Sequence, residues 1–180
     1  MKKPEHVIEI FLQPGEWYFG DRDTRIRTIL GSCVSLTVWH PRLLIGGMCH
    51  YMLPTRGGSV SVPALDGRYA DEAMALLLRE IRAAGTRPEE YQLKMFGGGN
   101  MFPNLKCLKD RAHVPYKNAE VARKLAALHG FRVSGEHLGG AGHRNVIFDV
   151  WSGHVWLKHH PSQRQDQCEV CDQRATCEAR

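Results

Sequence analysis

Two apolar runs separated by a short polar turn constrain the fold of this chain more than any other feature. The first run covers residues 34–39, the turn covers residues 40–42, and the second run ends at Leu53. Runs of this length on both sides of a turn are typical of a β-hairpin. Because a Gly-Ser dipeptide breaks the chain just before the first run, the sequence predicts that Cys33 lies at the mouth of a strand.

The hairpin predicts a close pairing between a cysteine and a histidine. If the turn centres between residues 41 and 42, Val38 lies opposite Ile45 and Cys33 lies opposite His50. The Cβ atoms of directly opposed residues in an antiparallel pair are roughly 4.5–5.5 Å apart, which lets a thiol and an imidazole meet. A β-bulge between the two strands would break this pairing.

Alternation along the two strands predicts which face of the hairpin packs against the core. The core face carries Val34, Leu36, Val38, Ile45 and Cys49, and the other face carries Cys33, Ser35, Thr37 and His50. Cys49 has small apolar neighbours, so we expect a buried, inert thiol that packs as a small hydrophobe. Cys33 is the candidate for chemistry.

The rest of the chain predicts further strands and two helices. Strands are expected over residues 7–12 and 91–96, from residue 131, and in a closing hairpin over residues 145–150 and 154–158; helices over residues 69–84 and 118–129; and loops over residues 14–20 and 55–66. The second helix is expected to be capped by Asn118 and stopped by Gly130. The mixture predicts an α/β fold of the mixed, α+β-like kind, with layered mixed sheets built from β-hairpins and two main helices in a single domain.

Size and composition fit one soluble domain. With 180 residues, 43% of them hydrophobic, the chain can bury a core without disulfides. The formal net charge of +5 favours acidic partners. The basic residues are scattered and accompany no nucleic-acid-binding motif, so nucleic acid is not an expected partner. No apolar window is long enough to span a bilayer, and the N-terminus lacks the apolar stretch of a signal peptide, so we expect a cytoplasmic protein that is not membrane-integral.

Cys33 and His50 fit the roles of a nucleophile and its base. Small neighbours let a substrate approach Cys33, backbone N–H groups at the break can stabilise an oxyanion, and a histidine can activate the thiol. The structural alternatives are a buried core cysteine and a histidine that is hydrogen-bonded at a strand end. In a reducing cytoplasm the six cysteines are free thiols, metal ligands or a nucleophile rather than a disulfide framework.

Four segments of the chain match the motifs of one known enzyme family. They are Leu30-Gly31-Ser32-Cys33-Val34, Gly46-Gly47-Met48-Cys49-His50-Tyr51-Met52-Leu53-Pro54, Lys94-Met95-Phe96-Gly97-Gly98-Gly99-Asn100-Met101-Phe102, and Gly139-Gly140 followed by Arg144-Asn145-Val146. Together they resemble the CheD family of chemoreceptor glutamine deamidases, over residues 7 to about 158. The resemblance implies a cytoplasmic hydrolase of bacterial chemotaxis signalling, a protein-glutamine glutaminase that needs no cofactor.

The resemblance also implies a catalytic group of a cysteine, a histidine and a threonine. The first two carry over onto Cys33 and His50. The family's threonine lies just before the Leu-Gly-Ser-Cys segment, and some relatives place it one residue earlier, where this chain has Arg27. Either Thr28, the nearest candidate, orients the histidine, or the dyad acts alone and Thr28 is an ordinary strand residue.

A run of three glycines at residues 97–99 is placed near the site by the same resemblance. The run lacks the lysine and the serine or threonine of a phosphate-binding P-loop, so nucleotide binding is not expected. Glycines after a strand instead let the backbone turn tightly or approach the break before Cys33. The predicted substrate-binding residues are Gly31 and Ser32 at the break and Asn100 after the glycine run.

The implied reaction turns a receptor glutamine into glutamate. The Cys33 thiolate attacks the side-chain carboxamide, His50 protonates the departing ammonia, and water activated by His50 hydrolyses the thioester. The expected partners are chemoreceptor cytoplasmic domains and, as in some relatives, a CheC-type phosphatase of the response regulator. Two other functions stay open: a non-catalytic adaptor of that phosphatase, and another cysteine acyltransferase, such as a transglutaminase-like or peptidase-like enzyme.

The last part of the chain has a different composition. Residues 1–160 form the predicted deamidase domain, and residues 161–180 form a polar tail that we expect to be flexible. Possible metal ligands in and near the tail are His159, His160, Cys168, Cys171 and Cys177. A second Cys-x-x-Cys pair at normal spacing is missing, so no metal site is predicted.

Overall fold

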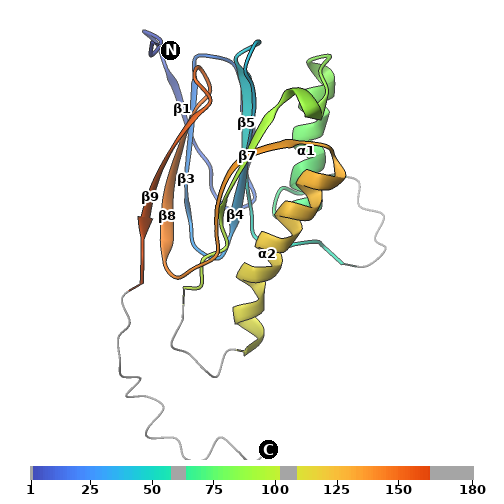
Figure 1. The fold of residues 1–180 in the computed structure, drawn as a ribbon, viewed down its shortest axis with the longest axis vertical. Coiled ribbons are helices and arrows are strands. Elements are labelled where there is room, and N and C mark those ends of the chain that lie inside the picture. The colour runs from blue at the N-terminus through green and yellow to red at the C-terminus, as the bar shows by residue number, and fades with distance from the viewer. Residues whose placement is uncertain (1, 58–63, 102–108, 163–180) are drawn as a thin grey trace, which may run out of the picture.

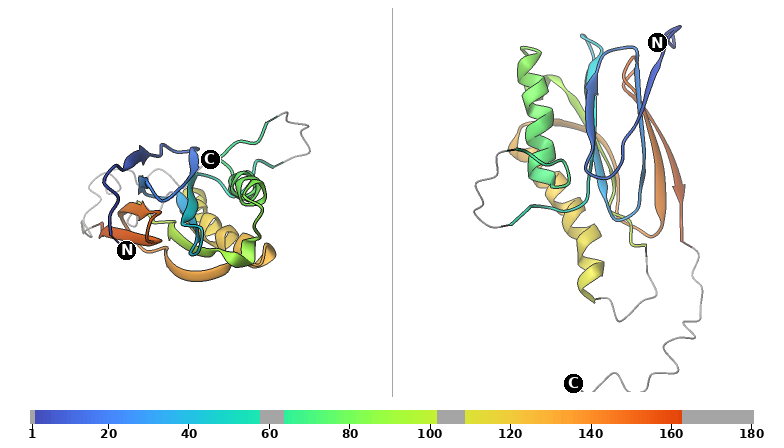
Figure 2. Two further views of the ribbon diagram at one scale, coloured as in Figure 1. Left: turned by 90° about the horizontal axis from the view of Figure 1, so that it is seen from above. Right: turned by 180° about the vertical axis from the view of Figure 1, so that it is seen from behind.

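Two β-sheets and two α-helices make up the described part of the chain in the computed structural model (Figure 1). The structure describes residues 2–57, 64–101 and 109–162. Figure 2 shows both helices on the same side of the pair of sheets, so the elements form three layers. This arrangement confirms the predicted class, an α/β domain of mixed sheets with two main helices.

Antiparallel pairs predominate in both sheets. Sheet A has the order β1 (Ile8–Phe11), β3 (Thr24–Leu30), β8 (His143–Asp149) and β9 (His154–His160). Sheet B has the order β2 (Trp17–Gly20), β5 (Ile45–Tyr51), β4 (Val34–His40), β6 (Gln92–Gly97) and β7 (Arg132–Leu138). The helices are α1 (Ala70–Ala83), α2 (Lys109–Leu128) and the short 3-10 helix η1 (Pro88–Glu90). Only the pairs β1–β3 and β6–β7 are parallel among the described strands.

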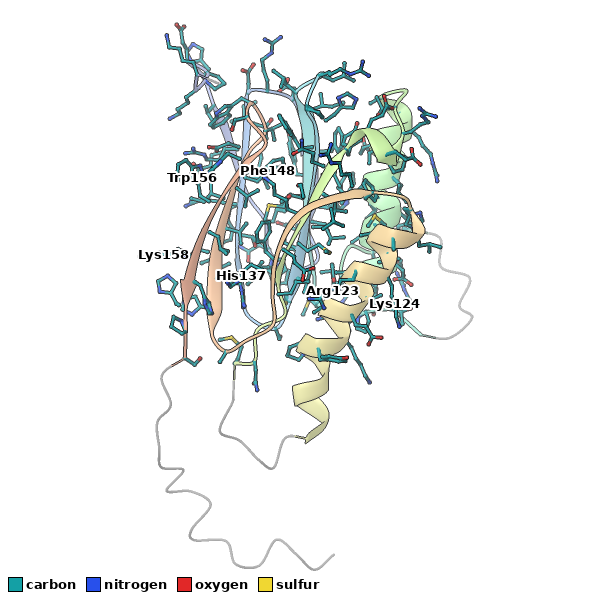
Figure 3. All side chains as sticks on the ribbon, viewed as in Figure 1. Arg123, Lys124, His137, Phe148, Trp156 and Lys158 are labelled. Atoms are coloured by element: carbon teal, nitrogen blue, oxygen red, sulfur yellow. The ribbon has the colours of Figure 1, made fainter. Side chains whose placement is uncertain are left out.

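The central hairpin of β4 and β5 is buried on both faces. On the helix side, Leu36 and Val38 belong to one hydrophobic core with Leu77 of α1. On the side of sheet A, Met48 belongs to a second core with Phe148 of β8 (Figure 3). The predicted core face is therefore confirmed, and sheet A covers the opposite face, on which the candidate histidine lies.

The register of this hairpin differs from the predicted one by two residues. The backbone pairing of β4 and β5 continues to His40, which pairs with Ile45. Ser35, rather than Cys33, therefore lies directly opposite His50. The predicted turn was wrong because the ring of His40 shapes it: Nδ1 accepts hydrogen bonds from the backbone N–H groups of residues 42 and 43, at 3.3 and 3.2 Å. Since side chains alternate with a period of two, this shift preserves the predicted faces.

A strand lies where the sequence predicts a loop. β2 pairs with β5 and places Phe19 beside Gly47. A Cβ atom at Gly47 would lie 2.7 Å from the Phe19 ring, so glycine makes room for this edge strand. Aromatic residues favour strands. Only four residues lie between Gly15 and Gly20, however, and a segment this short shows too little alternation to predict a strand.

Helix α2 begins at Lys109 rather than at the predicted Asn118. Pro115 lies inside the helix, where a proline usually ends or kinks the backbone, and this made the first turns hard to recognise. Asn118 is an interior residue and caps nothing. The predicted first helix, the strand from residue 131 and the closing hairpin of β8 and β9 are confirmed.

Candidate active site

The chain crosses from sheet A to sheet B at residues 31–33. β3 ends at Leu30 in sheet A, and β4 begins at Val34 in sheet B. Cys33 lies at the end of this crossover, partly exposed, with its side chain against the core between the sheets. The cysteine therefore lies at the mouth of a strand, as the sequence predicts.

A buried chain of hydrogen bonds joins β3 to β5. Thr28 Oγ1 lies 2.8 Å from the backbone oxygen of Leu12 and 2.8 Å from Nδ1 of His50. Because the Leu12 carbonyl can only accept, the Thr28 hydroxyl donates to it, and Nδ1–H of His50 donates to Thr28 Oγ1. The neutral imidazole thus carries its proton on Nδ1, and Nε2 keeps its lone pair. Thr28 and His50 are each 2% exposed.

Burial holds both Cys33 and His50 in their neutral forms. It lowers the pKa of His50 to about 4, against smaller opposing effects of the Leu12 carbonyl and of Glu16. It also raises the pKa of the Cys33 thiol, and a hydrogen bond with Ser32 offsets part of this rise. At neutral pH the resting pair is a thiol and an imidazole, so an attack by this sulfur would require the proton to move.

Cys33 and His50 share one face of the hairpin, one diagonal step apart. Ser35 opposes His50, and Cys33 precedes Ser35 by two residues. Diagonal neighbours on one face are roughly 7–8 Å apart, within reach of side chains. His50 Nε2 is buried and has no hydrogen-bond partner among the described residues. Catalytic hydrogen bonds are often long without substrate and shorten in the reactive complex.

Cys49 is the other cysteine in the described part of the chain. It is fully buried in the core beneath the helices. This burial raises the pKa of its thiol to about 12, so the thiolate is scarce at neutral pH. The predicted packing role of Cys49 is confirmed by its place in the core.

The glycine run at residues 97–99 packs its backbone against the crossover. The N–H of Gly98 donates to the Cys33 oxygen and the N–H of Gly99 donates to the Gly31 oxygen, each at 2.8 Å. Gly97 has a φ of 116°, and a Cβ atom there would lie 2.2 Å from the Cys33 oxygen. Only glycine can bring its backbone this close in that conformation. The structure thus brings the run next to Cys33, as the family resemblance implies.

The predicted substrate-binding residues lie around the same crossover. Gly31 and Ser32 form part of it and are partly exposed. Asn100 follows the glycine run, and its N–H donates to the Gly140 oxygen at 2.7 Å. Its own backbone oxygen accepts from the N–H of Gly142 at 3.0 Å. Asn100 therefore ties the glycine run to the loop between β7 and β8.

Two buried side chains that were not predicted as site residues also support this region. Asn118 Nδ2 donates to the backbone oxygens of Ser32 and Met52, at 3.1 and 2.7 Å. Arg144, which is 1% exposed, donates from Nη2 to the backbone oxygen of Gly139. The sequence held no local signal for either contact, since Asn118 fitted a helix cap and Arg144 was one residue of a longer motif.

The described part of the chain shows neither a cluster of metal ligands nor a membrane-spanning helix. No group of three or more histidine, cysteine, aspartate or glutamate side chains in them is arranged to hold a metal ion. None of the described helices is both long and apolar enough to cross a membrane. Cys168, Cys171 and Cys177 lie outside the described residues, so the predicted flexible tail stays a prediction.

The chain is similar to known proteins over most of its length. A protein of Pseudomonas savastanoi pv. phaseolicola (strain 1448A / Race 6), named probable chemoreceptor glutamine deamidase CheD, is 51% identical over 163 residues, which cover 91% of each chain. The chain belongs to the CheD family. A further relative from Dechloromonas aromatica (strain RCB), named probable chemoreceptor glutamine deamidase CheD 3, is 51% identical over 156 residues, 86% of this chain and 89% of that protein.

The CheD family model, described as CheD chemotactic sensory transduction, matches residues 52–159. This match begins just after His50, whereas an alignment that covers 91% of the chain includes the segment from Cys33 to His50. Among solved structures, the hypothetical protein YfiH of Bacillus licheniformis gives a TM-score of 0.41 at 14% identity, over 69% of this chain and 49% of that chain. That likeness is too weak to add to the assignment of this CheD chain.

Proposed function

We propose that this chain is a cysteine amidohydrolase that converts specific glutamine side chains of chemoreceptors to glutamate. Its relatives at 51% identity are named as chemoreceptor glutamine deamidases, which supports this substrate. The observation that carries the chemistry is the 2.8 Å hydrogen bond between Thr28 Oγ1 and His50 Nδ1. This bond fixes the tautomer in which Nε2 of His50 can act as a base.

The first half of the reaction forms a thioester and releases ammonia. Nε2 of His50 accepts the proton of the Cys33 thiol while the sulfur bonds to the carboxamide carbon. The carbonyl oxygen becomes an oxyanion, and the imidazolium is stabilised because its Nδ1–H donates to Thr28. When the oxyanion collapses, the C–N bond breaks, the imidazolium gives its proton to the nitrogen, and ammonia departs.

The second half consumes water and restores the enzyme. Nε2 of His50 takes a proton from a water molecule, whose oxygen attacks the thioester carbon. The C–S bond then breaks, the sulfur of Cys33 regains a proton from the imidazolium, and glutamate is released. Both halves use the same base and return it to its neutral form, with water as the co-reactant.

The crossover is the proposed oxyanion site. Its three successive carbonyl groups are all hydrogen-bonded: Gly31 to Gly99, Ser32 to Asn118 and Cys33 to Gly98. These bonds fix the peptide planes and therefore the directions of the intervening N–H groups. Donors held in place before the reaction stabilise a developing oxyanion without reorganisation. We propose that the backbone of Gly31 and Ser32 binds the substrate carboxamide and that Asn100 orients the substrate.

The proposed partners are chemoreceptor cytoplasmic domains, and the proposed location is the cytoplasm. A formal net charge of +5 favours approach to acidic receptor surfaces. Deamidation places a new negative charge on a receptor helix and so changes the repulsion between like charges on packed helices. A CheC-type phosphatase is a second proposed partner, bound without use of the Cys33 thiol.

Mass spectrometry of receptor cytoplasmic fragments tests this function. We expect the wild-type protein to convert glutamine to glutamate and release ammonia, and we expect Cys33→Ala to leave every glutamine unchanged. Cys49→Ala is the matched control, because it removes a buried thiol that the reaction does not use, and it should keep the activity. Conversion by Cys33→Ala would refute the proposed nucleophile. If neither the wild type nor Cys33→Ala changes any fragment while both bind a CheC-type phosphatase equally, the adaptor function takes the place of the enzyme.

A further inference from the structure

A helix side chain closes the end of the ladder between β4 and β5. Val34 and Tyr51 form the last backbone pair of this ladder. Beyond them the backbone oxygens of Ser32 and Met52 are bridged by Nδ2 of Asn118, at 3.1 and 2.7 Å. Asn118 is fully buried in α2, so a helix of the outer layer reaches the two strand ends of the central sheet.

Only a carboxamide of this length suits the position. Two carbonyl oxygens at the end of the ladder are both acceptors, and they need two N–H donors from one atom. The NH₂ group of asparagine supplies two donors, an aspartate carboxylate supplies none, and a serine hydroxyl supplies one. Asparagine also competes with the backbone in helix interiors and is disfavoured there, so its place in α2 serves the bridge rather than the helix.

The bridged carbonyls flank the two proposed reacting residues. Ser32 directly precedes Cys33, and Met52 follows His50 by two residues. The same helix position is bonded once more to β5, because the hydroxyl of Tyr51 donates to the backbone oxygen of Asn118 at 2.7 Å. Asn118 is therefore the side chain that joins the two strand ends directly, and the approach of sulfur to imidazole depends in part on it.

We propose that Asn118 is a positioning residue, which sets the approach of the Cys33 sulfur to Nε2 of His50 by holding the two strand ends together. The inference rests on the proposed function, because it assumes that these two side chains react as a pair. In this role Asn118 acts through the backbone oxygens of Ser32 and Met52. Misplacement of reacting groups by about 1 Å can lower a rate by about 100-fold.

The substitution Asn118→Asp tests the inference because it keeps the shape of the side chain and removes both donors. We expect kcat on a receptor fragment to fall by about 100-fold while KM stays close to the wild-type value, since remote substrate contacts are unchanged. Asn118→Ser, which keeps one donor, should fall between Asn118→Asp and the wild type. Leu125→Ala is the matched control on the same helix, since it removes core packing away from the strand ends, and it should lower Tm while kcat is kept.

Alkylation of Cys33 by iodoacetamide, followed on its own peptide by mass spectrometry, separates positioning from general damage. In the wild-type background Asn118→Asp should slow the His50-assisted reaction. In a His50→Ala background the same change should have little further effect, because two residues that act as one unit are not additive. Equal slowing in both backgrounds, or an Asn118→Asp protein with wild-type kcat, would overturn the inference.

The same measurements distinguish the failure of this inference from the failure of the proposed function. If His50→Ala itself leaves both deamidation and Cys33 alkylation unchanged, the proposed pair is wrong and the inference falls with it. If His50→Ala slows both reactions and Asn118→Asp slows neither, only the inference is overturned. If Asn118→Asp does not fold, Asn118→Ser is measured in its place. A wild-type kcat in Asn118→Ser, which has lost one donor, would overturn the inference. An intermediate kcat, with no further loss when the same change is made in the His50→Ala background, would support it.

Discussion

Replacement of Thr28 by valine removes one hydroxyl group and nearly preserves the shape of the side chain. That hydroxyl joins the Leu12 oxygen to Nδ1 of His50, with 2.8 Å on each side. Valine leaves a buried acceptor and a buried donor without partners, and each unsatisfied group costs about 1–3 kcal/mol. We therefore expect Thr28→Val to lower the free energy of unfolding by about 2–6 kcal/mol.

The effect on catalysis is separate and follows from the charge that His50 gains. The imidazolium donates a charge-assisted hydrogen bond to Thr28, and such bonds contribute about 1.5–3 kcal/mol. At about 1.4 kcal/mol for each factor of ten, the loss of this bond corresponds to a fall in kcat of about 10- to 150-fold. KM should change little, because Thr28 is buried and has no place in substrate contacts.

Steady-state kinetics on a receptor fragment, combined with urea denaturation, measures both effects of Thr28→Val. Thr28→Ser is the matched control, because it keeps the hydroxyl, and it should keep most of the wild-type kcat. A Thr28→Val protein that is folded at the assay temperature and has the wild-type kcat would refute the reasoning. It would mean that the orientation of His50 does not depend on its bond to Thr28.

Three further predictions concern the protonation of His50, the backbone at Gly97 and the packing of α1. The pKa of His50 is lowered from 6.5 to about 4 in the folded protein, so the unfolded chain takes up a proton first as pH falls and stability is lost below pH 6.5. Between pH 7.5 and 4.5 the wild type should lose about 2–3 kcal/mol more than His50→Asn in urea denaturation, and an equal loss in both would contradict this. Gly97→Ala would place a Cβ atom 2.2 Å from the Cys33 oxygen, so it should abolish most deamidation. Gly85→Ala is the control: Gly85 also has a positive φ, of 67°, but no atom lies within 4 Å, so the change should cost only about 1 kcal/mol of stability and keep the activity. Leu77→Ala, at a fully buried position of α1, should lower the free energy of unfolding by about 2–5 kcal/mol, while Leu128→Ala, at a position 75% exposed, should stay within about 0.5 kcal/mol of wild type in the same assay.

The hairpin shows which part of the fold a local pattern can predict. Alternation predicts the two faces because a face depends only on whether a residue is odd or even along the strand. The register is a finer property, since it depends on where the turn closes. That point is set by the ring of His40, which accepts two backbone N–H groups of the turn, and no alternation pattern contains that contact.

The sequence likewise predicts some residues of the candidate site and misses others. Cys33 stood out because small residues precede it. His50 stood out because the predicted register set it directly opposite the cysteine, whereas the structure sets Ser35 there. Thr28 came only from the family motif, since its partner lies in the other sheet and no local spacing predicts a bond between sheets. Asn118 was misassigned as a cap, because a cap and a bridge between strands both call for the same short polar side chain.

The sheet that carries Thr28 is completed late in the synthesis of the chain. Thr28 belongs to sheet A, which is complete only when β8 and β9, residues 143–160, have been synthesised. The cysteine and the histidine leave the ribosome long before that. A nascent chain that holds only β3, β4 and β5 therefore lacks the β8 strand that pairs with Thr28, and the proposed site is complete only when the last hairpin docks.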